Sequence, residues 1–276
     1  MIVTRRDGNL HLVAQVEHAR IAGQLAAAWG NSLFEPPRPA GAVRTAAARH
    51  DDGWRAWDAR VLFNELERRP MHFLEIDPDE HVRLYRRGVE EVALGDVYAG
   101  VLVGMHWTGL YRGRWRSSQG VHLADEEHRW IAAKREAWTA DEPRSMFETR
   151  LWHNYELLQL WDLLSLYLCV MPAEPASPDG PAVPWGPQLS SLDHQPQDVV
   201  LPSVRADPFW PALEITVRVV APGVASLDPY PFGDGEISVD VVSTPIADRA
   251  WTRAAVARQV RATCPETTTW RIQSAR

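Results

Sequence analysis

The stretch His50-Asp51-Asp52-Gly53-Trp54-Arg55-Ala56-Trp57-Asp58 gathers carboxylates and indole rings around the end of a predicted helix. The apolar spacing over residues 43–50 predicts this helix, and Gly53 is suited to end it. Ala46 and His50 are four residues apart, so His50 shares the apolar face of the helix. An imidazole next to a carboxylate is costly to bury without partners. The stretch therefore predicts further polar side chains facing it.

Three other predicted helices each carry one polar residue on an apolar stripe, where residues at i, i+3, i+4 and i+7 share a face. These helices and residues are 14–29 with His18, 97–111 with His106, and 146–170 with Asp162. Four helices then direct an imidazole or carboxylate inward. A shared metal ion is the simplest common cause of four such costly placements.

The donor set suits a divalent transition metal, one or two ions, and does not choose among Fe, Mn, Zn, Co and Ni. Such an ion lowers the pKa of a bound water and yields a hydroxide nucleophile. The predicted metal ligands are His18, His50, Asp51, His106 and Asp162. The predicted catalytic residues are Asp51, His106 and Asp52. Arg55, Trp54 and Gln15 are the predicted substrate-binding residues, and His122, Glu126, Glu127 and His128 are reserve ligands.

Each of these residues also has a purely structural interpretation. A single inward histidine is often a hydrogen-bonded core residue, and the run from Asp51 to Gly53 fits a turn with side-chain caps. Asp162 could pair with an arginine, Arg55 could be a solvated surface charge, and Trp54 could belong to the core. These interpretations would need a separate reason at every helix, so we favour the metal site.

Composition narrows the class of protein. The 276 residues carry a formal net charge of -7, which argues against a general nucleic-acid binder. The longest strongly apolar run, residues 163–171, is too short to span a bilayer. Charged residues from Arg5 onward leave no signal-peptide core. We therefore expect a cytoplasmic protein acting on a small-molecule substrate, with neither nucleic acid nor membrane as partner.

The remaining sequence predicts the organisation of the chain. A β-hairpin around Asp7-Gly8 opens it, residues 62–70 look irregular or partly helical, and residues 172–187 are rich in Pro, Ala and Ser. Further helices are predicted at 79–92, 125–138 and 248–262, and strands at 213–220, 236–242 and 267–272.

This pattern predicts a mainly α protein: a helical metal-binding bundle over 1–171, a Pro-rich linker over 172–190 and a smaller α+β extension over 191–276. The N-terminal hairpin could also pair with strands of the extension, which would make one compact unit. Pairing of strands between subunits would give a homodimer.

The order of His18, His50-Asp51 and Asp162 resembles the ligand order of HD-domain metal-dependent phosphohydrolases. The chain also resembles the DUF3891 family of uncharacterised bacterial proteins over nearly its full length. The segments that carry this likeness are Met1-Ile2-Val3, 15–25, 50–58, 98–106 and Asp228-Pro229-Tyr230-Pro231-Phe232.

The HD resemblance implies an HD-like helical core with one or two divalent ions. His18, His50, Asp51 and Asp162 match the four minimal ligand positions, and His106 matches an extra histidine of binuclear branches. The implied activity is hydrolysis of a small phosphorylated metabolite or nucleotide. A di-iron oxygenase on the same scaffold and a non-catalytic metal- or ligand-binding protein stay open as alternatives.

Overall fold

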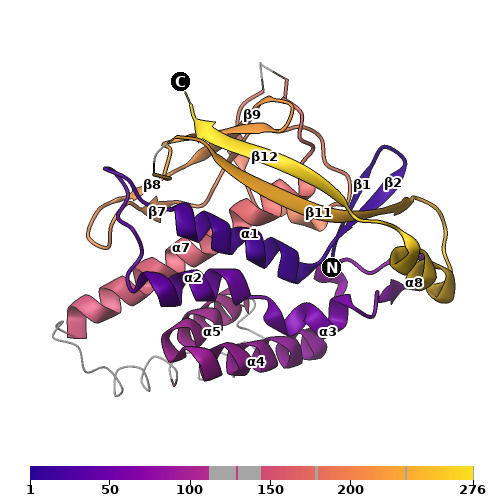
Figure 1. Cartoon of the computed structure of the whole chain (residues 1–276), viewed down its shortest axis with the longest axis horizontal. Helices are drawn as coiled ribbons and strands as arrows, with labels where there is room; N and C mark the ends of the chain where they lie inside the picture. Colours follow the sequence, from indigo (N-terminus) through magenta and orange to yellow (C-terminus); the bar gives the residue numbers. More distant parts are fainter. Residues whose placement is uncertain (112–128, 130–143, 178–179, 234, 276) are drawn as a thin grey trace.

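A large mixed β-sheet and a layer of helices on one side of it make up the protein (Figure 1). The computed structural model describes residues 1–111, 129, 144–177, 180–233 and 235–275. The helix predicted at 125–138 and the reserve ligands His122, Glu126, Glu127 and His128 lie outside the described residues.

Within the described residues the sheet has eight strands in the order β1-β2-β11-β12-β10-β9-β6-β5. Neighbouring strands run antiparallel except for the β12–β10 and β6–β5 pairs, which are parallel. The strands are β1 (Ile2–Arg6), β2 (Asn9–Val13), β5 (Val183–Pro184), β6 (Val199–Val200), β9 (Thr216–Ala221), β10 (Val224–Asp228), β11 (Ile237–Ala247) and β12 (Glu266–Ser274). Two short hairpins lie outside this sheet: β3 (Phe63–Asn64) with β4 (Arg69–Pro70), and β7 (Val204–Arg205) with β8 (Ala212–Leu213).

The helical layer agrees closely with the predicted helices. Its members are α1 (Gln15–Ala28), α2 (Ala40–Arg49), α3 (Arg55–Asp58), α4 (Pro78–Gly95), α5 (Val97–Tyr111) and α7 (Arg144–Val170). The helix α8 (Arg253–Ala262) contacts β11 and β4. The described part of the chain also contains the short 3-10 helices η1 (Asp52–Trp54), η2 (Phe73–Glu75) and η4 (Pro187–Ser190).

The predicted fold class, a mainly α HD-like helical bundle with a small α+β extension, is wrong. The sheet is a principal layer of the fold, because β2 of the N-terminal hairpin pairs with β11 near the other end of the chain. The open alternative, pairing of the hairpin with strands of the tail, is confirmed by the register Thr244 opposite Leu12 and Ile246 opposite Leu10. Residue periodicity identified most of these strands but not their joining into one sheet, since strand partners are long-range choices.

The helix α1 joins the two layers. It packs against α2 and α7 on one side and against β11 of the sheet on the other (Figure 1). Ile21, Ala22 and Leu25 of its apolar stripe are fully buried, and burial of such side chains is the main favourable term in folding. His18 shares this stripe and is 1% exposed, so the packing that forms the core also fixes this imidazole inside it.

A close backbone contact positions the segment that follows His50. A Cβ atom built on Gly53 of η1 would lie 2.1 Å from the carbonyl oxygen of Leu84 in α4. A Cβ on Gly88, one turn further along α4, would lie 2.8 Å from the Gly53 nitrogen. Gly53 was predicted to end the preceding helix, but that helix already ends at Arg49. The glycine instead lets η1 lie directly on the backbone of α4.

His72 ties three separate segments together. Its Nδ1 accepts a hydrogen bond from the Val3 N–H at 3.1 Å, and its Nε2 donates to the Leu189 carbonyl at 3.2 Å. One nitrogen accepts and the other donates, which requires the neutral imidazole. Burial lowers the pKa of His72 to about 4. The hairpin, η2 and η4 are thus held around an imidazole that favours the uncharged form.

We expect acid to destabilise the fold through His72. The unfolded chain binds a proton below a pKa of about 6.5, while the folded chain binds it only near 4. Between these values the unfolded state holds more protons, so this contribution to stability is complete above pH 6.5 and is lost as the pH falls. Urea titrations should show a loss of about 2 kcal/mol from this group between pH 7 and pH 5.

The comparison for this prediction is His72→Gln, which keeps a donor and an acceptor but does not titrate. The difference in unfolding free energy between the two proteins should shrink by that amount as the pH falls from 7 to 5. A difference that stays constant over this range would contradict a neutral, buried His72.

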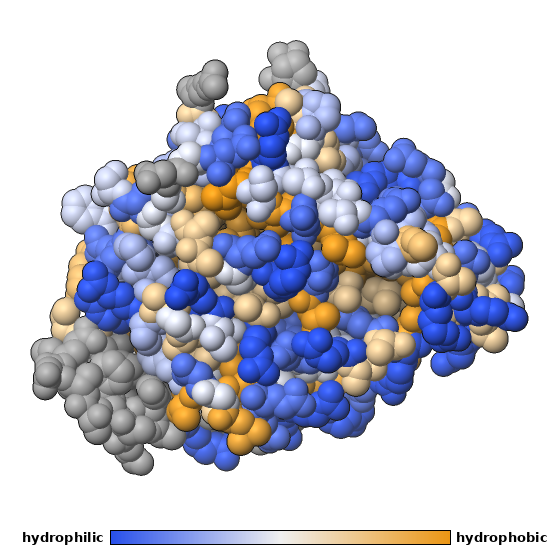
Figure 2. Space-filling model, viewed as in Figure 1, coloured by the Kyte–Doolittle hydropathy of each residue, from blue (hydrophilic) through white to orange (hydrophobic). Residues whose placement is uncertain are grey.

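The surface seen in Figure 2 is mostly hydrophilic, with hydrophobic side chains in smaller areas between. Among the described helices, none is both long and apolar enough to cross a membrane.

Candidate metal centre

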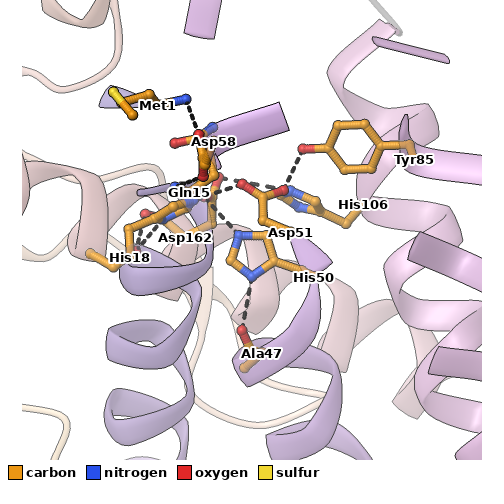
Figure 3. A network of polar contacts seen from close by, with 11 residues as sticks. Met1, Gln15, His18, Ala47, His50, Asp51, Asp58, Tyr85, His106 and Asp162 are labelled. Atoms are coloured by element: carbon orange, nitrogen blue, oxygen red, sulfur yellow. Dashed lines mark hydrogen bonds and ion pairs between the residues drawn. The ribbon is translucent and has the colours of Figure 1, made fainter. Parts of the chain in front are cut away.

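Side chains from three helices and from the turn after α2 converge in a buried cluster (Figure 3). His18 comes from α1, His106 from α5 and Asp162 from α7, while His50 and Asp51 directly follow the last residue of α2. All five are at most 7% exposed. The structure therefore brings together the whole set of predicted metal ligands.

Three of these residues have the spacing of a metal site. One ligand atom from each of His18, His50 and Asp162 can be chosen so that all three lie within 4.8 Å of one another. The His50 Nε2 lies 3.3 Å from Asp162 Oδ1, and the His18 Nδ1 lies 3.7 Å from the same oxygen. Two imidazoles and a carboxylate are a donor set that divalent transition metals accept.

The orientation of His50 is fixed from behind. Its Nδ1 lies 2.8 Å from the Ala47 carbonyl oxygen, which only accepts hydrogen bonds, so Nδ1 carries the proton. Its Nε2 is buried and has no hydrogen-bond partner in the part of the chain that the structure describes. Metal-binding histidines usually have this arrangement, with one nitrogen donating to a carbonyl and the other facing the ion.

His18 links the two carboxylates of the cluster. Its Nε2 lies 2.8 Å from Asp51 Oδ2, and its Nδ1 lies 3.0 Å from the Ser165 hydroxyl. The Ser165 hydroxyl donates to the backbone carbonyl oxygen of Asp162 at 2.7 Å, which fixes its own position beside the imidazole. This chain of contacts fixes the plane of the His18 ring.

Asp51 is held as a carboxylate by its neighbours. Tyr85 of α4 donates its hydroxyl proton to Asp51 Oδ1 at 2.6 Å, on the side opposite the His18 contact. Burial alone would raise the pKa of Asp51, but the imidazoles of His50 and His18 lower it well below its usual range. Burial likewise opposes a charge on His50, yet Asp51 and Asp162 raise the pKa of His50 to about 9. The cluster thus combines strongly coupled charges of both signs.

His106 completes the cluster on the side of α5. Its Nε2 lies 4.0 Å from Asp162 Oδ2, the oxygen that does not face His50. Its Nδ1 is buried without a hydrogen-bond partner among the described residues. Burial lowers the pKa of His106 to about 4, so this imidazole is neutral near pH 7 and can act as a metal ligand.

Two predicted site residues lie apart from the cluster. Asp52 accepts from Arg49 Nε at 2.7 Å and from Arg55 at 3.0 Å. The Arg55 side chain is 67% exposed, and neither Asp52 nor Arg55 lines the cavity. The chain turns into η1 after His50 and Asp51, and this turn directs the Asp52 side chain toward the two arginines.

Gln15 and Trp54, two of the predicted substrate-binding residues, line the cavity. Gln15 begins α1, and its backbone N–H donates to Asp58 Oδ2 at 2.6 Å. The other oxygen of Asp58 lies 2.6 Å from the Met1 amino group (Figure 3). Asp58 therefore satisfies a free N–H at the start of α1 and positions the helix that carries His18.

The sequence analysis missed Tyr85 and Ser165. Tyr85 falls on the apolar face of α4 between Val82 and Val89, where it reads as a core aromatic residue. A buried tyrosine hydroxyl needs a hydrogen-bond partner. This requirement was the available signal that Tyr85 has a polar neighbour. Nothing in the local sequence identified that neighbour as Asp51.

The cavity above the cluster has a volume of about 190 Å³. His18, Asp51, His106 and Asp162 form its polar end, with Tyr85 and His81 beside them. Apolar side chains of η2, η4 and α7 form much of the remaining wall. An ion at the polar end would face a space large enough for a small ligand.

The chain matches the profile of one protein family, and no curated protein or solved structure gives a match. The family is described as "Protein of unknown function (DUF3891)", and the match covers residues 1–247. That range includes every residue of the buried cluster and the sheet as far as the end of β11. The resemblance to DUF3891 is thereby confirmed, and the chain belongs to the DUF3891 family.

Proposed function

We propose that the protein is a metal-dependent hydrolase whose ion is held by His18, His50 and Asp162, with Asp51 beside them. The observation that carries this proposal is the buried His50 Nε2, which faces Asp162 at 3.3 Å while Nδ1 is fixed by the Ala47 carbonyl. A bound divalent ion supplies Lewis acidity and lowers the pKa of a coordinated water to near neutrality.

The residues around the ion have separate tasks in this proposal. Tyr85 holds Asp51 through its 2.6 Å hydrogen bond, and Ser165 holds the His18 ring at 3.0 Å. Mutation of residues that make such contacts behind the ligands usually lowers metal affinity or activity 10- to 100-fold. His106 faces the same cavity and is available as a further ligand or as a contact to the substrate.

Phosphoric esters are the first substrate class to test, because the order of His18, His50-Asp51 and Asp162 resembles that of HD-domain phosphohydrolases. Arg55 and Arg49 both contact Asp52, and neither arginine lines the cavity. The hydrolase proposal therefore depends on the metal cluster, and the phosphate part depends on the resemblance.

Replacing Asp51 by Ala should abolish both metal binding and turnover while leaving the helical layer intact. The protein would be purified without chelator or metal-affinity tag and assayed by inductively coupled plasma mass spectrometry and against a panel of phosphoric esters. Wild type should hold about one or two equivalents of a transition metal. Activity should fall at least about 100-fold in Asp51→Ala, since even contacts behind a ligand cost 10- to 100-fold.

The matched variant is Asp52→Asn, which changes the neighbouring carboxylate. Asp52 contacts arginines rather than the cluster, so this variant should keep its metal. Retention of metal and activity in Asp51→Ala would contradict the proposal.

A di-iron oxygenase is the second candidate, and His106 is the observation that favours it. His50 and His106 face opposite oxygens of Asp162, at 3.3 and 4.0 Å, so one carboxylate lies between two imidazoles and could serve two ions. About two equivalents of iron with substrate-dependent oxygen consumption would support this candidate. A single equivalent of metal and equal turnover without oxygen would exclude it.

A further inference from the structure

The cavity above the cluster has two kinds of lining. The cluster residues make part of it polar, and hydrocarbon side chains make up much of the rest, namely Phe73, Leu74, Ile76, Leu163, Leu166 and Leu189, called the apolar wall below. Among the described residues that line it, none is an arginine or a lysine. A wall of this composition stabilises apolar groups and offers no countercharge for an anionic one.

The apolar wall is also built in advance of any ligand. Phe73 and Leu74 belong to η2 and Leu189 belongs to η4. His72, the residue before η2, bonds to the Leu189 carbonyl at 3.2 Å and to the Val3 N–H at 3.1 Å. The two wall segments are thus held together, and a fixed pocket binds more tightly because less ordering is needed on association.

The volume sets the size of the group that fits. The cavity measures about 190 Å³, and a dry apolar cavity of about 150 Å³ is known to hold benzene. One aromatic ring or a branched alkyl chain of similar size therefore fills the wall region. The reacting group of the same molecule then lies at the polar end, against His106 and Asp162.

We infer that the substrate carries an uncharged aromatic or branched aliphatic group next to the bond that is cleaved, and that this group binds against η2, η4 and α7. This inference rests on the proposed function, because the cluster is taken to orient the reacting end. It adds the substrate class, which the cluster alone does not define.

The test uses two hydroxamates, which chelate metal ions through the same group and differ only in their apolar part. Calorimetric titration of metal-loaded protein should show benzohydroxamate binding at least about tenfold more tightly than acetohydroxamate, as expected from burial of the phenyl ring. Metal content is measured first on the same sample.

Three variants locate the contact. Leu74→Asp places a charge on the wall, and Ile76→Trp fills it; each should remove most of the preference for benzohydroxamate over acetohydroxamate, while the metal content stays that of the wild type. Leu74 is 47% exposed, so its replacement leaves the core intact. The control Leu66→Asp changes a leucine that is 88% exposed and does not line the cavity, and it should keep the preference.

The outcomes separate the two proposals. Protein that holds no stoichiometric metal after reconstitution contradicts the proposed function and removes the basis of the inference. Metal-loaded protein that binds both hydroxamates equally, or whose preference survives both wall variants, retains the proposed function and overturns the inferred substrate class.

Discussion

His50→Ala should lose stoichiometric metal, with a metal affinity at least about 100-fold below that of the wild type. The reason is geometric: His50 is the one ligand of the cluster whose Nδ1–H is fixed by a backbone carbonyl, at 2.8 Å from Ala47, while Nε2 faces Asp162. Removing the ring leaves His18 and Asp162 without the third donor of the group. Metal content and a competitive chelator titration would measure the loss.

His153→Ala is the matched control for this variant. His153 is 3% exposed, comparable to His50, and its Nε2 lies 3.0 Å from the Arg205 carbonyl, outside the cluster. Both variants remove one buried imidazole, so both lose some stability, but only His50→Ala should lose metal. Equal metal content in the two variants would show that the inward histidines serve the fold alone.

Gly53→Ala should lower the free energy of unfolding by about 3 kcal/mol, a large effect for one methyl group. The added Cβ would lie 2.1 Å from the Leu84 carbonyl oxygen, and the contact is with backbone, which cannot rotate away. Either η1 or α4 must move to accommodate it. Because Asp51 directly precedes η1 and Tyr85 lies on α4, the same movement should weaken metal binding.

Gly41→Ala provides the comparison in urea unfolding experiments. Gly41 lies in α2, and a Cβ atom there would have no neighbour within 4 Å. Alanine is the better helix former, so this variant should be slightly more stable than wild type, by up to about 1 kcal/mol. If Gly53→Ala were as harmless as Gly41→Ala, the close packing of η1 on α4 would be refuted.

The two predictions concern different parts of one arrangement. His50 supplies a donor atom, whereas Gly53 allows the turn after His50 to lie against α4 so that Tyr85 reaches Asp51. Membership in the DUF3891 family does not name a reaction, so these variants test whether the buried polar cluster binds metal or only stabilises the core.

The helices and the inward position of their polar residues could be predicted from local sequence patterns. The stripes that carry His18, His106 and Asp162 follow the helical repeat, and a repeat records directly which face of a helix is buried. The N-terminal hairpin was equally accessible, because its Asp7-Gly8 turn and strand alternation are local signals.

The architecture and the detailed contacts of the site depend on long-range packing, which local patterns do not encode. The pairing of β2 with β11 joins segments more than 200 residues apart, and strand alternation does not encode a partner. The turn of η1 placed Asp52 against Arg49 and Arg55, while α4 brought Tyr85 to Asp51. Periodicity indicates the direction of a side chain around the axis of its own helix. The atom that this side chain contacts depends on how two helices lie relative to each other, and packing across the whole core sets that arrangement.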